Sequence, residues 1–174
     1  MLIGAPGAGK SSVLEAVTSR LEARGVSYGA IESEELSRGW PLLPAESWIA
    51  QLAAVLRLQR ERGRTLFLVA ATTETAEESG GVLNALSADE VLVVCLEASP
   101  DIVASRIAER EPDRWPGKQR LIAHARELAL SIPQIQAIDL RIDTEGREPD
   151  DVAAEVEHEL VALSDHRPRL LVAA

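Results

Sequence analysis

The residues most able to do chemistry stand at the start of the chain, in the stretch Gly4-Ala5-Pro6-Gly7-Ala8-Gly9-Lys10-Ser11. This stretch matches the pattern G-x-x-x-x-G-K-[ST] without a substitution. Its three glycines allow a tight turn in which backbone N–H groups face inward and form a concave nest for phosphate oxygens. In this pattern Lys10 reaches the β- and γ-phosphates of a nucleotide, the Ser11 hydroxyl binds Mg²⁺, and Ser12 is placed to support the α-phosphate. The stretch predicts a site for a nucleoside triphosphate with Mg²⁺; the alternative is a glycine-rich turn that binds nothing.

The pattern has this meaning only between a strand and a helix. Residues 1–3 are apolar and are typical of the end of a strand. Over residues 10–24 apolar side chains recur at helical spacing, and Gly25 follows at a position that suits a helix stop. A buried central strand usually has about five or six residues. We therefore expect either an unusually short strand or further residues upstream of Met1.

Composition limits the class of protein. The 174 residues suffice for one domain with its own core, which we expect over residues 1–164, followed by a loose tail over 165–174. A net charge of −10 argues against a general nucleic-acid binder, which needs a basic face. No apolar run approaches the ~20 residues of a membrane span, and no signal peptide precedes the loop. The lone Cys95, inside an apolar run, predicts a small core residue and a reducing, cytoplasmic setting.

Strand and helix patterns alternate along the rest of the chain. We expect strands over residues 26–32, 65–70, 90–96 and 138–143. We expect helices over residues 46–62, 75–86, 99–110, 118–130 and 149–163, the second of which opens with the capping box Thr75-x-x-Glu78. This alternation predicts an α/β fold with a parallel sheet covered by helices on both faces. The phosphate loop then lies at the carboxyl end of a central strand, where such sheets bind ligands.

The chain resembles the small P-loop kinases, a group that includes the nucleoside monophosphate, shikimate, gluconate and adenylylsulfate kinases. The resemblance lies in the order of the predicted elements and in the loop motif Gly4–Ser11. The order of elements covers nearly the whole chain, but only the loop motif is specific. The resemblance implies a three-layer P-loop NTPase fold with a five-stranded parallel sheet in the order 2-3-1-4-5 and a small helical lid. It also implies ATP and Mg²⁺ as cofactors, a mobile substrate-binding segment at about residues 33–62, and an arginine-bearing lid at about 106–126.

Two acidic residues, Glu32 and Glu34, stand where several of these kinases have Asp-x-Asp at the end of the second strand. There the carboxylates help to hold Mg²⁺ through water and orient or deprotonate the acceptor hydroxyl. Residues i and i+2 of a strand share a face, so a strand tip can point both carboxylates toward the phosphates. The alternative is an acidic first turn of the following helix, stabilised by the helix dipole. Arg38 follows closely and is a candidate for binding an acidic group of the acceptor.

Arg106 and Arg110 stand four residues apart on the helix that enters the lid, so they project from one face. They look like the family's Arg-x-x-x-Arg, whose members lie over the adenine and contact the transferred phosphate. Arginine suits both stacking and bidentate phosphate contact. A solvated helix face with pairs to Glu109 and Glu111 is the alternative. Thr144 belongs to a turn that resembles the family's Asp-Thr turn near the base.

The tip of the third strand departs from the nucleotide kinases, which commonly carry an acid there. In this chain Thr72 and Thr73 occupy the tip. Small hydroxyl residues recur there in some small-molecule kinases, so the resemblance implies a metabolite acceptor near Thr72; alternatively, Thr73 only begins the next turn. Trp40 and Trp48 flank a proline-rich bend and either line the acceptor pocket or pack that segment.

Beyond the lid loop, Lys118, Arg120 and Arg126 either close onto the site from the far side or form a solvated face. Only two of the 18 basic residues are lysines, which suggests that Lys118, like Lys10, serves a place that needs a compact ammonium. We expect His124 to be a bystander on a helix surface, and we find no metal-ligand spacing.

These features predict a kinase that transfers the γ-phosphoryl group of MgATP to the hydroxyl of a small-molecule metabolite. The predicted catalytic residues are Lys10, Glu32, Glu34, Arg106 and Arg110. We expect a monomer or homodimer with no nucleic-acid or membrane partner. A non-catalytic nucleotide-binding module is the alternative, because the third strand lacks the acid and Glu-x-Glu replaces Asp-x-Asp. A simple nucleotide hydrolase is a third hypothesis, although no switch residue stands out.

Overall fold

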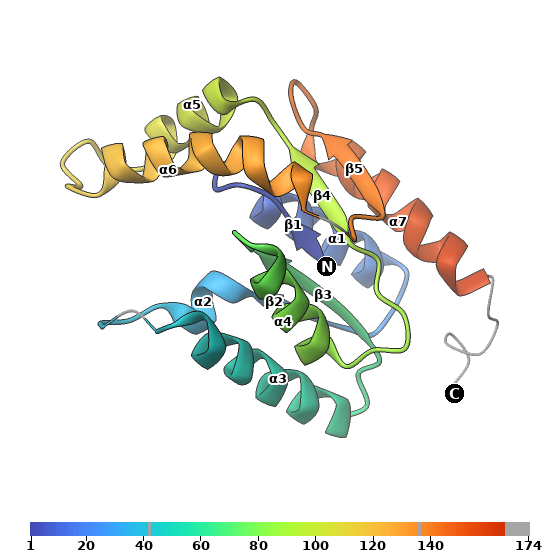
Figure 1. The fold of residues 1–174 in the computed structure, drawn as a ribbon. Coiled ribbons are helices and arrows are strands. Elements are labelled where there is room, and N and C mark those ends of the chain that lie inside the picture. Colours follow the sequence, from blue (N-terminus) through green and yellow to red (C-terminus); the bar gives the residue numbers. More distant parts are fainter. Residues whose placement is uncertain (42, 136, 166–174) are drawn as a thin grey trace.

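The computed structural model describes residues 1–41, 43–135 and 137–165, and it forms three layers with a sheet between two layers of helices (Figure 1). The expected tail lies, apart from its first residue, outside the described residues. Among the described residues, none of the helices combines the length and the apolar character that crossing a bilayer requires.

One parallel sheet contains all the strands of the described residues, in the order β2-β3-β1-β4-β5. Its strands are β1 (Leu2–Ile3), β2 (Tyr28–Glu32), β3 (Leu66–Ala71), β4 (Val94–Glu97) and β5 (Leu140–Asp143). The predicted strand order and the P-loop NTPase fold are confirmed. Strand β1 has only two residues, yet it pairs on both sides: Leu2 is in register with Ala70 of β3 and with Val94 of β4.

The helices follow the predicted order with one addition. They are α1 (Lys10–Ala23), α2 (Ser33–Ser37), α3 (Ala45–Glu61), α4 (Ala76–Leu86), α5 (Pro100–Arg110), α6 (Lys118–Ser131) and α7 (Pro149–Asp165), with a short 3₁₀ turn η1 (Ile132–Gln134). Helix α2 was given only as the alternative to a strand tip at Glu34. The fourth strand begins at Val94 rather than at residue 90, because the neighbouring β1 is too short to pair with residues before Val94.

Successive residues of each strand face opposite helical layers. Leu2 of β1 packs in the cluster formed with α1 and α7, whereas Ile3 packs on the other face with α5 and α6. A third cluster on that second face joins β2 and β3 to α3 and α4. Cys95 of β4 is fully buried, as expected of a core residue, and burial raises the pKa of its thiol to about 11.

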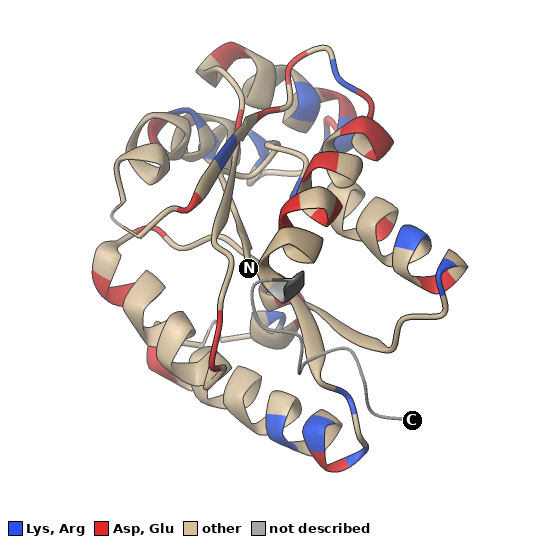
Figure 2. Ribbon diagram, turned by 90° about the vertical axis from the view of Figure 1, so that its right-hand side faces the viewer, with Lys and Arg blue, Asp and Glu red and all other residues tan. Residues whose placement is uncertain are grey.

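An ion cluster fastens α1 to α7 behind the sheet. Arg20 Nε donates to Glu157 Oε2 at 2.8 Å, and an Arg24 nitrogen donates to Glu157 Oε1 at 2.5 Å. These hydrogen bonds, from Arg24 first and then Arg20, lower the pKa of the Glu157 carboxyl. Across the molecule, acidic positions occur on most helices and basic positions lie among them (Figure 2).

Candidate active site

The phosphate-type loop joins the end of β1 to the start of α1, as its sequence pattern predicts. Gly7 needs to be glycine for two reasons. Its φ of 84° lies in the left-handed region, and a Cβ there would come within 2.7 Å of the Val103 carbonyl oxygen. The loop closes on itself through the Ala8 N–H, which donates to the Ala5 carbonyl at 3.0 Å. This packing against α5 holds the loop in the strand–loop–helix context that the motif requires.

Lys10 begins α1 and turns its side chain back over the loop. Its Nζ donates to the carbonyl oxygens of Gly4 at 3.0 Å and Ala5 at 3.3 Å, and it lies 3.7 Å from Glu34 Oε1. The side chain is buried, and this burial lowers the pKa of the ammonium; the nearby carboxylate of Glu34 acts in the opposite direction. The Lys10 ammonium is therefore held against the loop, next to the negatively charged Glu34 carboxylate.

The two predicted carboxylates both reach the loop. Ser11 Oγ donates to Glu32 Oε2 at 2.8 Å, and Thr72 Oγ1 donates to Glu34 Oε1 at 2.7 Å. The expected reason for this convergence is wrong, because β2 ends at Glu32 and Glu34 lies in the first turn of α2. The helical turn, rather than a shared strand face, places Glu34 over Lys10 and beside the tip of β3. The alternative, a helical first turn, therefore describes the backbone at Glu34 correctly. The Glu34 carboxylate nevertheless faces the loop, as the functional prediction requires.

The donor set on this flank suits a hard cation. Magnesium prefers oxygen ligands and is usually bound by one or two carboxylates together with substrate phosphates and water. Ser11 Oγ and the Glu32 carboxylate, 2.8 Å apart, are oxygens of this kind. Within the described residues no group of three or more His, Cys, Asp or Glu side chains is arranged to hold a metal by itself. A cation at this place therefore depends on the phosphates as ligands.

Arg106 and Thr144 form the opposite flank of the loop. The Arg106 guanidinium donates to the Gly7 carbonyl at 3.1 Å, to Thr144 Oγ1 at 3.0 Å and to the Thr144 carbonyl at 2.8 Å. Thr144 is buried, and its hydroxyl also lies 3.1 Å from the Ala8 carbonyl oxygen. These hydrogen bonds join α5 and the turn after β5 to the loop. Arg106 and Thr144 therefore help to fix the position of the loop.

Arg110 lies one turn further along α5. It is exposed, and its Nε donates to Glu111 at 2.9 Å, which is the local pair that the solvated-face alternative predicts. Its positive charge nevertheless acts on Lys10, where it contributes to the lowered pKa. Arg110 therefore lies near enough to the ammonium to act on it, while its own hydrogen bond is to Glu111.

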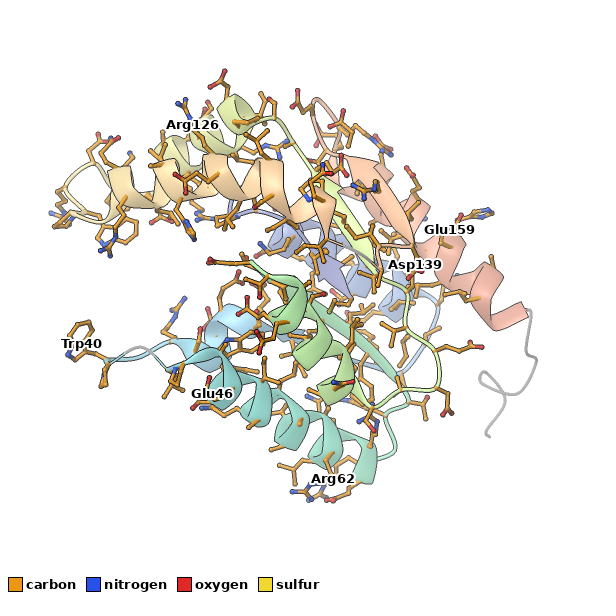
Figure 3. The ribbon with its side chains drawn as sticks, in the orientation of Figure 1. Trp40, Glu46, Arg62, Arg126, Asp139 and Glu159 are labelled. Carbon is orange, nitrogen blue, oxygen red and sulfur yellow. The ribbon has the colours of Figure 1, made fainter. Side chains whose placement is uncertain are left out.

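Two predicted acceptor residues have other contacts. Trp48 is buried in the cluster of α3 with Leu52 and Val69, so it packs this segment. Arg38 is exposed and pairs with Glu35 at 2.6 Å. Trp40, in contrast, is 92% exposed at the tip of the segment between α2 and α3 (Figure 3). No contact in the described residues assigns an acceptor role to Trp48 or Arg38, and that role remains a prediction.

Sequence reasoning missed the contacts of two residues of α6. The buried Lys118 ammonium donates to the carbonyls of Ala108 at 2.6 Å and Glu111 at 2.8 Å and to Asp113 Oδ1 at 2.7 Å, so it fastens the loop between α5 and α6. His124 was expected to be a bystander, but its Nε2 lies 2.9 Å from Glu74 Oε1, in the segment after β3. The scarcity of lysine was the one available signal for the first contact. Nothing in the sequence indicated the second.

Comparisons with known proteins agree with this architecture. The family model described as AAA domain matches residues 1–129. Among solved structures, the APS kinase of Mycobacterium tuberculosis in complex with AMPPNP and APS is 24% identical, with a TM-score of 0.67 over 92% of this chain and 95% of that one. A gluconokinase from Sinorhizobium meliloti 1021 is 22% identical, with a TM-score of 0.61 over 94% and 95% of the two chains.

A more distant similarity is to the shikimate kinase of Acinetobacter baumannii in complex with shikimate, which is 15% identical with a TM-score of 0.58 over 93% of this chain and 92% of that one. No curated protein matches the chain significantly. At these identities the structural similarities establish the fold.

Proposed function

Because the chain belongs to the AAA domain family, whose model matches residues 1–129, we propose that it is a kinase that transfers the γ-phosphoryl group of MgATP to a hydroxyl group of a small molecule. The observation that carries this proposal is the convergence of Ser11–Glu32 and Lys10–Glu34–Thr72 at the mouth of one phosphate-type loop. The kinases named above share the fold, and the complexes described for two of them contain shikimate, and APS with the nucleotide analogue AMPPNP.

In this proposal the two flanks of the loop have different tasks. The Arg106–Thr144 flank holds the loop in shape beside the nucleotide, and the Glu32–Glu34 flank receives the acceptor. Bound Mg²⁺, held by Ser11 with Glu32 and the phosphates, would neutralise charge on the β- and γ-phosphates. Lys10 stabilises the charge of the transferred group.

The transfer itself needs one proton acceptor. Glu34 is the better placed carboxylate, because Thr72 and Lys10 already orient it at the tip of β3. It takes the proton of the acceptor hydroxyl as that oxygen bonds to the γ-phosphorus, the bond from this phosphorus to the β–γ bridging oxygen breaks, and ADP leaves. Arg110 approaches the developing charge when the lid closes, and closure excludes water so that ATP is not hydrolysed.

Calorimetry with MgATP and an acceptor-dependent assay of ADP release test the proposal together. The Lys10→Ala variant should lose turnover, because the ammonium that offsets phosphate charge is gone, while its circular dichroism stays that of the parent. Binding of MgATP without ADP release in the presence of any hydroxylated metabolite would instead support the nucleotide-binding module. Absence of MgATP binding to the folded parent protein would refute both.

A further inference from the structure

In the part of the chain that the structure describes, Thr73 carries the only buried side-chain nitrogen or oxygen without a hydrogen-bond partner. Thr73 follows β3, and its side chain is fully buried. A buried hydroxyl without a hydrogen bond destabilises the folded chain, because it loses its bonds to water and gains none within the protein. Such an exception calls for an explanation, and a role in ligand binding is one of those available.

The polar side chains on either side of Thr73 do have partners. Thr72 Oγ1 donates to Glu34 Oε1 at 2.7 Å. On the other side, Glu74 Oε1 lies 2.9 Å from His124 Nε2. The unpaired hydroxyl is therefore a feature of one position and not of a segment that lacks hydrogen bonds.

The strand pairing brings Thr73 beside the phosphate-type loop. Strand β3 is the direct neighbour of β1, and Ala71 is in register with Ile3, the last residue of β1 (Figure 1). Thr73 lies two residues beyond Ala71, and Ala5 of the loop lies two residues beyond Ile3. Both segments therefore leave the sheet at the same edge, the carboxyl edge at which such sheets bind ligands.

The order of the strands places Thr73 on the side of the terminal phosphate. Strand β3 lies on one side of β1, whereas β4 and β5 lie on the other, with the turn after β5 on the opposite flank of the loop. Lys10, which reaches the β- and γ-phosphates in this motif, has its Nζ 3.7 Å from Glu34 Oε1. The same carboxylate oxygen accepts the hydroxyl of Thr72, the residue before Thr73.

The Thr73 hydroxyl can turn toward a ligand without a change in fold. A threonine Oγ1 occupies one of three staggered positions about the Cα–Cβ bond, and the methyl group can take the position that the hydroxyl leaves. Residues 72–75 form irregular backbone between β3 and α4, so this rotation breaks no hydrogen bond of a strand or helix. A phosphoryl oxygen is a charged acceptor, which makes it a strong partner for a hydroxyl donor.

We propose that the Thr73 hydroxyl donates to an oxygen of the γ-phosphoryl group of bound MgATP. Because this hydrogen bond forms only in the loaded protein, Thr73 lowers the stability of the free protein and favours the triphosphate over the diphosphate. The inference rests on the proposed function, because it adds a contact to the group that the kinase transfers. It gives the chain a means of distinguishing ATP from ADP, the product that has to leave after each transfer.

Thr73→Val tests the inference, because it removes the hydroxyl and keeps the shape of the side chain. Calorimetric titration of the full chain measures the affinities for Mg-AMPPNP and MgADP, and scanning calorimetry measures the Tm of the nucleotide-free protein. We expect the Tm to rise by about 2–4 °C, because the unpaired hydroxyl is gone. We expect the affinity for Mg-AMPPNP to fall about tenfold, which corresponds to 1.4 kcal/mol, and the affinity for MgADP to stay that of the parent.

Thr73→Ser changes the same position in the opposite sense, because it keeps the hydroxyl and removes the methyl group. It should lower the Tm and keep the preference of the parent for Mg-AMPPNP. Thr75→Val is the matched control, since the Thr75 hydroxyl already accepts the Glu78 N–H at 3.1 Å as the cap of α4. It should lower the Tm and leave both affinities unchanged.

A lower Tm for Thr73→Val would overturn the inference, because it would show that the hydroxyl already has a partner in the free protein, such as an ordered water. Unchanged binding of Mg-AMPPNP to this variant, or an equal loss for MgADP, would overturn it as well. These measurements need no acceptor. Failure of the parent to release ADP with any acceptor would therefore refute the kinase and leave the γ-phosphate contact standing.

Discussion

Replacing Lys118 by methionine should loosen the lid while leaving the sheet intact. Methionine keeps the length and apolar character of the lysine stem, so the change removes mainly the ammonium. That ammonium donates to the carbonyl groups of Ala108 and Glu111, which are the end of α5 and the start of the lid loop. It also lowers the pKa of the Asp113 carboxyl through a hydrogen bond, but this carboxyl is fully exposed and adds little to stability.

The magnitude follows from the two carbonyl contacts. A hydrogen bond from a charged donor contributes about 1.5–3 kcal/mol, so two contribute about 3–6 kcal/mol before the cost of burying the ammonium is subtracted. We therefore expect the α5–α6 connection to lose about 2–3 kcal/mol. At 1.4 kcal/mol for each factor of ten, the population of the open lid loop rises about 30-fold or more.

Limited trypsin digestion measures that population, with mass spectrometry following cleavage after Arg114 in the lid loop. The Lys118→Met variant should be cleaved there at least ten times faster than the parent, and its acceptor-dependent ADP release should fall. Arg126→Met is the matched control on the same helix; its exposed pair is worth about 0–1 kcal/mol, so its cleavage rate should change little. Equal cleavage of the Lys118 variant and the parent would show that Lys118 does not fasten the lid loop.

Two further predictions concern the catalytic flank and the packing of α1 on α7. Glu34→Gln should lower kcat by about 10²–10⁴ with little change in MgATP affinity, since it removes a proton acceptor but keeps the shape of the side chain; an unchanged kcat would assign proton transfer elsewhere. Glu157→Gln should lower the free energy of unfolding at pH 7 by about 2 kcal/mol, because Glu157 binds Arg20 and Arg24 as a carboxylate. The folded-state pKa of Glu157 is depressed, so this stabilisation is present above its ordinary value of 4.5 and is lost as the pH falls through the lower folded value. Urea titrations at pH 7 and pH 3 should therefore show the difference between parent and variant shrinking in acid. Glu155→Gln on the same helix is the control: the half-buried Glu155 has a single surface pair, with Arg147 at 2.9 Å, which is worth about 0–1 kcal/mol, so its variant should differ less from the parent at pH 7.

The parts of the fold that depend on local pattern were predictable from the sequence. The loop motif, the helix that follows it and the capping box at Thr75, whose hydroxyl accepts the Glu78 N–H at 3.1 Å, all lie within a few residues of one another. The strand order came from resemblance, since no residue pattern specifies which strands are neighbours. The limits of β4 were wrong because they depend on the length of β1, which is distant in sequence.

The loop and its two neighbouring carboxylates could be predicted from the sequence, but the contacts made by α6 could not. Glu32 and Glu34 were identified by their position at the end of a strand, but the helical turn that aims Glu34 at Lys10 was only the alternative to a shared strand face. The contact of His124 with Glu74 joins residues 50 positions apart, and it depends on how α6 lies against the segment after β3. Such a contact leaves no periodicity or spacing in the chain, so it became visible only in three dimensions.

The central place of β1 in the sheet has a mechanical consequence. Strand β1 pairs with β3 on one side and with β4 on the other, so it lies between the half of the sheet that carries α2 and α3 and the half that leads into α5 and α6. The phosphate-type loop starts at the very next residue, Gly4. We therefore expect a displacement of either half of the sheet to be transmitted to the phosphate-type loop through this strand.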